Sequence, residues 1–557
     1  MKRFATVCMV LATMVLASCN CAQKMQKNID KIEVACNPEV MTLKGSSVTA
    51  EVTVTFPPRY FDEETIMKIT PVLVYEGGEI AGTPKFVQGE YVEDNYTTIV
   101  KAEGGSYTQT VTFPYTPAAN KGTLELRFES RCADDCSPKF ADFVPFAAIA
   151  AAQGIDATQN AANNAEGMGY MKDNFSRVTT ISSEAEIKYL INSAKVRPAQ
   201  LSEASINEFE AFIKENVEKA NVTLGNVFSK GYASPDGPEN FNDKLSKQRS
   251  ESGQTAIQEK LEGVNVSYDA AAYGEDWDGF KALVEASSLK DKDLILNVLS
   301  MYSNPAKRDQ EIKNLSSVYK VLAEEILPEL RRTQFVATAE VEGMTDAQLL
   351  AAAKANNKNL TVEEMLYAAT LTNNAAEKAA IYNMAAQTYN DVRAWNNLAV
   401  AEAAQGKLAE AKAALQKAAQ LKSAPEITNN LAMVAVAQGN VAEAKQYLNS
   451  LGANEAKTAK GLLALAEGDY SAASAQLTGY NKAVAEVCNN NLAAAKSAIA
   501  NDNSADAEYL KAVIAAKEGD SKAAASYLNS AIAKNPALKA QAQNDANFAK
   551  FAAELGL

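Results

Sequence analysis

The sequence predicts three folded regions of different class: an N-terminal all-β sandwich, a central α+β domain and a C-terminal all-α solenoid. Residues 31–146 alternate apolar and polar side chains with a period of two, as half-buried strands do. Residues 184–343 alternate strand-like and helix-like segments, and residues 344–557 contain alanine-rich helices with an internal repeat. A chain of 557 residues is long enough for several such domains.

Composition and charge exclude several classes of function. Hydrophobic residues make up 47% of the chain and charged residues 22%, which is typical of globular protein. The formal net charge of −14 repels a phosphate backbone, so we expect no nucleic-acid partner. The chain has no histidine, which excludes Ser-His-Asp catalysis and imidazole metal sites. We therefore expect no cofactor and no metal.

The N-terminus has the pattern of an export signal. Lys2 and Arg3 precede an apolar run that is too short to cross a bilayer, and small residues follow before Cys19. The stretch Leu-Ala-Ser-Cys ending at Cys19 resembles the lipobox of bacterial lipoproteins. That resemblance implies a signal at 1–18, a lipidated Cys19 that attaches the chain to a membrane, and a tether at 19–30. The alternative is an ordinary signal that is cut after Ala22.

The sandwich prediction for residues 31–146 is based on short alternating segments separated by Gly, Pro, Asn and Asp turns. Because an exported chain meets an oxidising compartment, a disulfide between two of Cys36, Cys132 and Cys136 is one hypothesis, and buried free thiols are the other. Residues 147–183 are rich in alanine, asparagine and glycine without an apolar face, so we predict a linker there.

The central region 184–343 has the order β-α-β-α-β with a final strand, which predicts helices on one face of a sheet. A strand ends in the turn "GYASPDGPENF", and a helix predicted at 238–261 follows. Asn242, Leu245 and Arg249 lie on one stripe of that helix, because positions i, i+3 and i+7 share a face. The turn and this stripe are the candidate site of the region.

Gly231 with the turn ending at Gly237, the stretch "NDKLSKQRSES" and the pair Arg331-Arg332 resemble the OmpA-like domain, which holds peptidoglycan. The resemblance implies that Arg249 binds a carboxylate of the peptidoglycan stem peptide, a task that suits the guanidinium fork. Ser234 stands where that family has an aspartate that faces the ligand's ammonium group. Either Asp236 takes over that role, or the turn serves only to start the helix. The peptidoglycan-binding candidates are Arg249, Asn242, Ser234 and Asp236.

A helical insertion, predicted at about 276–328, separates the last two strands. The stretch "GEDWDGF" at its start brings Glu275 and Asp278 close together, which one interpretation treats as a carboxylate pair for acid/base work. The other interpretation is a helix N-terminus, where acidic residues are favoured, with Trp277 and Phe280 packed beneath it.

The C-terminal region 344–557 contains an internal repeat of 33 residues, in which "WNNLAVAEAAQG" aligns with "TNNLAMVAVAQG". Spacing and residue types resemble degenerate tetratricopeptide repeats (TPR), and each repeat must stack on a neighbour to bury its apolar side. The resemblance implies a solenoid that docks protein partners, and a purely architectural array is the alternative. The signature positions are Trp395, Leu398, Ala399, Gly406, Ala411, Leu431, Ala432, Gly439 and Ala444.

The combination resembles multi-domain outer-membrane lipoproteins of Bacteroidota type. It implies a non-enzymatic scaffold of the cell envelope, periplasmic or surface-exposed, which links the outer membrane to peptidoglycan and docks protein partners on its TPR-like repeats. One alternative is an envelope-assembly or surface-antigen adaptor that does not bind peptidoglycan. A second is a carboxylate-dependent glycan hydrolase using Glu275 or Asp278.

Overall fold

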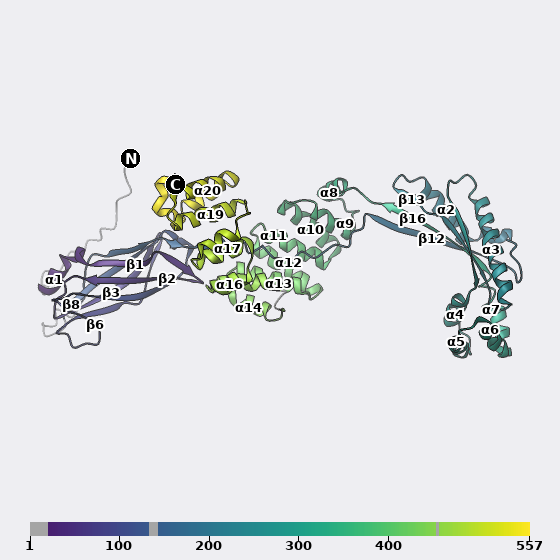
Figure 1. The fold of residues 1–557 in the computed structure, drawn as a ribbon, viewed down its shortest axis with the longest axis horizontal. Helices are drawn as coiled ribbons and strands as arrows, with labels where there is room; N and C mark the ends of the chain where they lie inside the picture. The colour runs from purple at the N-terminus through teal and green to yellow at the C-terminus, as the bar shows by residue number, and fades with distance from the viewer. Residues whose placement is uncertain (1–19, 133–142, 453–455) are drawn as a thin grey trace. The chain divides into compact units, whose positions relative to one another are not determined.

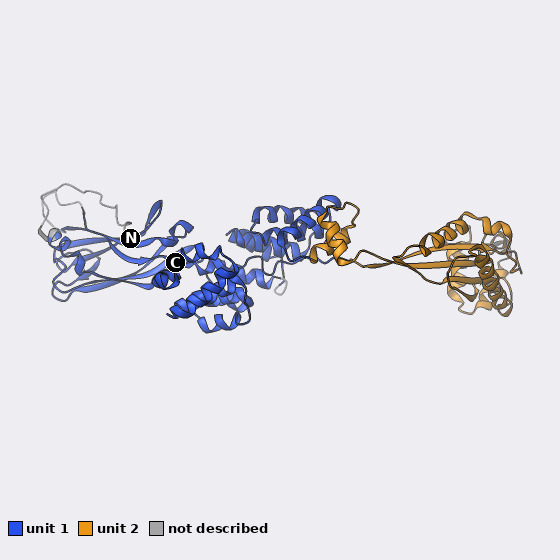
Figure 2. Ribbon diagram, turned by 90° about the horizontal axis from the view of Figure 1, so that it is seen from above, with its two compact units in different colours: residues 1–173, 372–557 blue, residues 174–371 orange. Residues whose placement is uncertain are grey.

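The computed structural model describes residues 20–132, 143–452 and 456–557, so the predicted signal and Cys19 lie outside the described residues. The chain forms two compact units (Figure 2). The first combines residues 1–173 with residues 372–557, and the second consists of residues 174–371. The second unit therefore interrupts the first along the chain.

The N-terminal strands form two sheets that share one hydrophobic core (Figure 1). One sheet has the order β11-β1-β2-β7, and the other has the order β10-β8-β3-β5-β6, with β4 paired to β3 and β9 to β8. In β2, alternate side chains from Val48 to Phe56 are buried, as the period-two pattern predicts. The strands are β1 (Glu33–Lys44), β2 (Ser47–Phe56), β3 (Thr65–Tyr75), β4 (Gly78–Ala81), β5 (Lys85–Gly89), β6 (Thr97–Ile99), β7 (Gly105–Pro114), β8 (Thr123–Cys132), β9 (Val144–Pro145), β10 (Ile149–Gln153) and β11 (Ile155–Asp156).

The linker prediction for residues 147–183 is wrong, because most of this stretch is built into the two units. Strand β10 pairs antiparallel with β8, and β11 pairs parallel with β1. A 3-10 helix, η4 (Thr158–Ala161), follows, and β12 begins at Val178. Alanine in a short strand gives no alternation of apolar and polar residues, so the sequence pattern does not reveal these strands.

The second unit contains a mixed sheet in the order β12-β16-β14-β15, with β13 paired to β16. Helices α2 and α3 pack on one face of this sheet, where Phe209, Ile257 and Phe335 share a core. This is the α+β arrangement that the sequence predicts. The elements are β12 (Val178–Lys188), α2 (Ala204–Val217), β13 (Val222–Leu224), β14 (Val227–Ala233), α3 (Glu239–Lys260), β15 (Tyr268–Glu275) and β16 (Arg332–Glu342).

The predicted insertion between the last two strands is present as four helices with a core of their own, which includes Phe280, Ile295 and Leu322. These helices are α4 (Trp277–Ala286), α5 (Lys292–Met301), α6 (Pro305–Asn314) and α7 (Ser316–Glu325). Two further helices, α8 (Asp346–Lys354) and α9 (Val362–Thr370), complete the second unit.

The rest of the chain is a solenoid of paired helices that belongs to the first unit (Figure 1). Within the described residues no helix is both long enough and apolar enough to span a bilayer. The helices are α10 (Ala375–Tyr389), α11 (Val392–Ala403), α12 (Leu408–Leu421), α13 (Pro425–Ala437), α14 (Val441–Leu448), α15 (Lys457–Ala466), α16 (Tyr470–Gln476), α17 (Gly479–Cys488), α18 (Leu492–Ala498), α19 (Ala505–Lys517), α20 (Ser521–Lys534), α21 (Leu538–Ala542) and α22 (Ala552–Leu555).

Four of the turns inside these helix pairs follow one sequence rule, and the turn at Gly406 lacks the side-chain cap. A residue with positive φ ends the first helix, and a capping residue starts the second. Gly439 has φ of 74°, and the Asn440 side chain then accepts a hydrogen bond from Glu443. Because L-residues avoid positive φ, glycine or asparagine is favoured at the first position. The same order recurs at Gly468-Asp469, Asn490-Asn491 and Gly519-Asp520.

Candidate functional site

Arg249 lies on the face of α3 that packs against the sheet, and it is only 1% exposed. The helix approaches β14 very closely here, because a Cβ added to Gly231 would lie 2.0 Å from the carbonyl oxygen of Ser246. Asn242 and Leu245 are also buried, so the stripe predicted from their spacing faces inward. The glycine in the strand thus allows the helix to carry a long cationic side chain into the interior.

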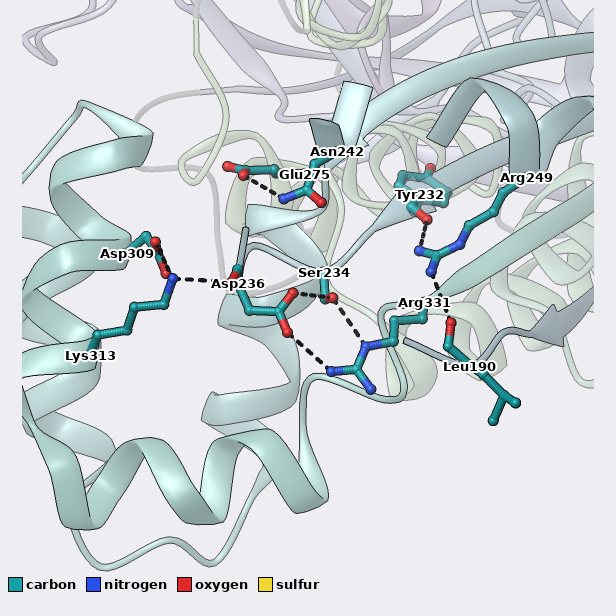
Figure 3. Close-up of polar contacts among 10 residues, drawn as sticks. All are labelled: Leu190, Tyr232, Ser234, Asp236, Asn242, Arg249, Glu275, Asp309, Lys313 and Arg331. Carbon is teal, nitrogen blue, oxygen red and sulfur yellow. Dashed lines mark hydrogen bonds and ion pairs between the residues drawn. The ribbon is translucent and has the colours of Figure 1, made fainter. Parts of the chain in front are cut away.

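The guanidinium of Arg249 is held by backbone carbonyls (Figure 3). Its Nε donates to Ser193 at 3.0 Å, Nη1 donates to Tyr232 at 2.9 Å, and Nη2 donates to Leu190 at 3.4 Å. The group also lies 5.3 Å from the ring centre of Tyr189. No carboxylate of the described residues forms an ion pair with Arg249, so its charge is balanced by backbone dipoles, the ring face of Tyr189 and the more distant charge of Asp236.

Burial lowers the pKa of Arg249 to about 10, because removal from water disfavours the charged form. The side chain nevertheless stays protonated at neutral pH. A guanidinium has five N–H donors, and three of them point at the carbonyl oxygens described above. Chemically, this arrangement is a buried cation with spare donors, which is the electrostatic setting that a carboxylate ligand requires.

Ser234 and Asp236 come together with Arg331 in one hydrogen-bonded cluster (Figure 3). The Ser234 hydroxyl donates to Asp236 at 2.6 Å and accepts from Nε of Arg331 at 3.2 Å. Asp236 forms an ion pair with Arg331 at 3.1 Å. Pro238 precedes α3 as its cap residue, and no side chain caps this helix. Asp236 therefore does not start the helix, and its carboxylate lies beside Ser234.

The remaining candidate, Asn242, donates to Glu275 at 2.9 Å (Figure 3), and Trp277 donates to the other oxygen of Glu275 at 2.9 Å. Burial raises the pKa of Glu275. Next to it, Asp276 caps α4 by accepting from Gly279 at 2.8 Å. The stretch "GEDWDGF" thus begins a helix, as one of the two interpretations predicts, while Asp278 is exposed to solvent.

The helical insertion also reaches the turn that carries Asp236. Lys313 on α6 donates to the backbone carbonyl of Asp236 at 3.1 Å and pairs with Asp309 at 2.6 Å (Figure 3). The insertion therefore contacts the turn that carries Asp236. A search of the described residues finds no group of acidic or cysteine side chains that could hold a metal ion.

A second site lies on the solenoid, where the chain binds part of itself. Residues 162–171, which we call the strap, run along helices α11, α13 and α17. Asn430 accepts from the amide of Gly169 at 2.8 Å and donates to its carbonyl at 2.9 Å. Asn397 holds Met171 in the same way, at 2.7 and 2.9 Å.

Asn481 repeats the arrangement on Asn163, at 2.8 and 2.9 Å. We call Asn397, Asn430 and Asn481 the asparagine ladder. Each of these asparagines is nearly inaccessible to solvent, and each satisfies one N–H and one C=O of the strap. The strap has no helix or strand, only a turn at residues 164–167, and the ladder spares its other backbone groups from being buried unpaired, which is costly.

Sequence analysis did not identify the asparagine ladder, although the sequence contains a signal for it. The stretches "NNLA" at Asn396 and Asn429 are 33 residues apart in helices that are otherwise alanine-rich. Polar amides at equivalent positions of a buried helix face must find partners, and here the partner is the strap. The repeated asparagines indicate that these amides are hydrogen-bonded, but they do not identify the hydrogen-bond partner.

The predicted TPR signature residues occupy the positions that the repeat needs. The small residues pack between helices without exposure, and Gly406 and Gly439 adopt positive φ at the turns. Trp395 is nearly buried and donates to Asn390 at 2.9 Å. The signature residues without exposed surface are Ala399, Ala411, Ala432 and Ala444. The signature leucines, Leu398 and Leu431, are also buried. The array is thus TPR-like in its own packing.

Of the cysteine candidates, Cys132 is disulfide-bonded, and Cys36 is a half-buried free thiol. Cys136 and the predicted lipid site Cys19 lie outside the described residues. Burial raises the pKa of the Cys36 thiol, which makes this group a poor nucleophile at neutral pH.

No family model matches this chain, and no curated protein does either. Among solved structures, the chain is similar to the APC/C hetero-tetramer Cut9-Hcn1, with 17% identity and a TM-score of 0.28 over 34% of this chain and 46% of that one. It is similar to a tetratricopeptide repeat protein from Parabacteroides merdae ATCC 43184 (13% identity, TM-score 0.30, covering 36% and 90%). YrrB, a TPR protein with an unusual peptide-binding site, also matches (21% identity, TM-score 0.20, covering 35% and 99%). The chain spans less than half of the length of the Cut9-Hcn1 chain that it matches.

Proposed function

We propose that this protein is a non-enzymatic scaffold of the bacterial cell envelope. In this proposal a lipid on Cys19 anchors it in the outer membrane, the α+β unit binds peptidoglycan, and the solenoid docks a protein partner. The observation that carries the wall-binding step is the buried guanidinium of Arg249. It has spare N–H donors and no carboxylate partner among the described residues.

A stem-peptide carboxylate fits the guanidinium of Arg249. Hydrogen bonds between charged groups are worth roughly 1.5–3 kcal/mol, and more donors can act together when the carboxylate lies in the plane of the fork. The carbonyls of Leu190, Ser193 and Tyr232 fix the plane of the fork in advance. Less conformational entropy is then lost on binding, which supports reversible attachment through this single side chain.

The membrane side of the proposal depends on the lipobox-like stretch that ends at Cys19. An acyl chain contributes about 0.8 kcal/mol per buried methylene, so stable anchoring needs more than one chain. The proposed tether therefore has one long-lived end in the membrane and one exchangeable end on the cell wall.

Cosedimentation with insoluble peptidoglycan tests the wall-binding step. We compare the mature unlipidated chain with Arg249→Lys, which keeps the charge but loses the fork, and with Arg249→Ala. Arg127→Ala is the matched control, because it removes an exposed positive charge on the sandwich. We expect wild type and Arg127→Ala to pellet alike, and both Arg249 variants to remain in the supernatant. Equal pelleting of all four chains rejects the role of Arg249.

One observation favours the adaptor alternative, in which the α+β unit does not bind peptidoglycan. Asp236 is already paired with Arg331 at 3.1 Å, so its carboxylate is neutralised before any ligand ammonium arrives. Cosedimentation separates the two functions. A folded wild-type chain that stays in the supernatant at low salt favours the adaptor.

A further inference from the structure

We propose that the asparagine ladder is a peptide-binding site that the chain keeps closed with its own strap. We further propose that a partner peptide enters this site by displacing residues 162–171. The inference rests on the docking role proposed for the solenoid, and it adds the location of the docking site and the chemistry of the partner. It does not depend on wall binding by Arg249.

The ladder binds main chain and not side chains. Asn397, Asn430 and Asn481 each contact one N–H and one C=O of the same strap residue, at 2.7 to 2.9 Å. The main chain of another protein offers the same groups when it adopts the turn that the strap makes at residues 164–167. Hydrogen bonds to the ladder therefore give affinity without requiring the strap's own sequence, as main-chain recognition does in other peptide sites.

Two strap positions add selectivity to this main-chain binding. Gly167 has φ of 91°, and a Cβ placed there would lie 2.7 Å from the Cγ2 methyl of Thr458. A ligand thus needs glycine at this position. The next residue, Met168, is only 8% exposed, so the ligand needs an apolar side chain there. The partner is a segment that turns as residues 164–167 do, with a glycine at the end of the turn followed by a large apolar residue.

The strap fills its groove incompletely. A cleft of about 310 Å³ remains between residues 162–168 and the helices α11 and α13, with apolar walls that include Met433 and Val434. A side chain larger than Met168 can bury more apolar surface in this space, at about 25 cal/mol per Å². A partner with phenylalanine at this position therefore gains binding free energy. This gain offsets the advantage that the strap has from its covalent attachment.

Tethering explains why the site stays closed in the absence of a partner. The strap is covalently attached, so it competes with an effective concentration in the millimolar range. An external peptide binds only to the fraction of molecules in which the strap is released, and its apparent affinity falls by that fraction. A variant with a weakened strap must therefore bind the peptide more tightly than wild type.

Fluorescence anisotropy with a labelled peptide tests this inference. The probe has the sequence of residues 162–173 with Met168→Phe, and it is titrated onto the mature full chain. Gly167→Val in the chain opposes the strap through strained φ and the contact with Thr458. We expect this variant to bind the probe at least tenfold more tightly than wild type. Adding Asn397→Ala and Asn430→Ala to it must abolish the gain.

Two controls make the result specific. A second probe carries Gly167→Val as well as Met168→Phe. It must not bind the Gly167→Val chain, because the site itself accepts only glycine at this position of the ligand. Asn449→Ala, an exposed asparagine on the same array, must leave the gain intact. Equal affinity of wild type and Gly167→Val, or a gain that survives loss of the two ladder amides, overturns the inference.

Hydrogen exchange on the wild type gives a second readout if Gly167→Val does not fold. Saturating probe must accelerate exchange at the amides of Asn163, Gly169 and Met171, and unchanged protection overturns displacement. A partner that copurifies equally with wild type and with the Asn397→Ala, Asn430→Ala chain leaves docking intact and rejects the ladder as its site. Copurification with neither chain rejects docking itself.

Discussion

Asn430 pairs with Gly169 across 261 residues of sequence, accepting from its amide at 2.8 Å and donating to its carbonyl at 2.9 Å. One buried amide side chain thus replaces the strand neighbour that an extended segment lacks. Both partners are held in the first unit, which joins the strap to the solenoid.

Asn430→Ala should loosen the strap locally. It removes the two hydrogen bonds between Asn430 and Gly169 and leaves the Gly169 amide unpaired, at a cost of about 1–3 kcal/mol, while the Gly169 carbonyl keeps a hydrogen bond from Asn396 at 2.8 Å. Hydrogen exchange at Gly169 should accelerate by about tenfold or more, because 1.4 kcal/mol corresponds to a factor of ten. The exposed Asn449→Ala should leave this rate unchanged, and equal rates in both variants would show that the pairing contributes nothing.

Lys517→Met should destabilise the protein in a manner that depends on pH. Burial alone would raise the pKa of Asp156, but Lys517 at 2.5 Å and hydrogen bonds from Thr158 and Asn547 outweigh burial and lower it. A carboxyl whose folded-state pKa is lowered stabilises the protein above its unfolded value of about 3.9 and loses this contribution as pH falls.

We expect Lys517→Met to lower the free energy of unfolding by about 1–3 kcal/mol at pH 7. This is less than the roughly 3–5 kcal/mol for a fully buried pair, since Lys517 is partly exposed. The loss should shrink below about pH 4, because the unfolded chain then takes up a proton at Asp156, which the folded protein, with the lowered pKa of this group, takes up only at lower pH. Urea titrations at pH 7 and pH 3.5 measure both values, with the exposed Lys522→Met as control. A loss that is the same at both pH values contradicts the role of the ion pair.

Gly231→Ala should disturb the packing of α3 on the sheet. The added methyl would meet the Ser246 carbonyl at 2.0 Å, and backbone cannot move aside as a flexible side chain does. Overpacking of this kind costs about 1–3 kcal/mol or more. Thermal unfolding checks the loss, with Gly169→Ala as control, where the nearest atoms lie at 3.8 Å. Equal losses would show that the close approach is unimportant.

Local patterns predicted the parts of this structure that depend on local physics. The spacing of Asn242, Leu245 and Arg249 placed all three on one face of α3, because helical periodicity decides which residues share a face, and the structure buries that face. Glycine at 406 and 439 marked the repeat turns for the same kind of reason. Likewise, β2 alternates as predicted.

Contacts between distant residues were not predictable in this way. Asp236 pairs with Arg331, which lies 95 residues further along the chain. Ser234, which stands where the OmpA-like family has an aspartate, joins these two residues in a cluster of three. The strap carries no periodic signal, since its backbone bonds go to side chains of helices that lie far along the sequence. Composition alone described it as a linker, because composition does not register partners supplied from elsewhere.

The long sequence separation between strap and ladder has a consequence for synthesis. Met171 leaves the ribosome 226 residues before Asn397 and must wait for its partner, which at 5–20 residues per second takes roughly 10–45 s. During that time the amides of Asn163, Gly169 and Met171 lack their partners on the solenoid. The first unit can be completed only after the whole α+β unit has been synthesised. The strap is therefore synthesised early but reaches its binding site late.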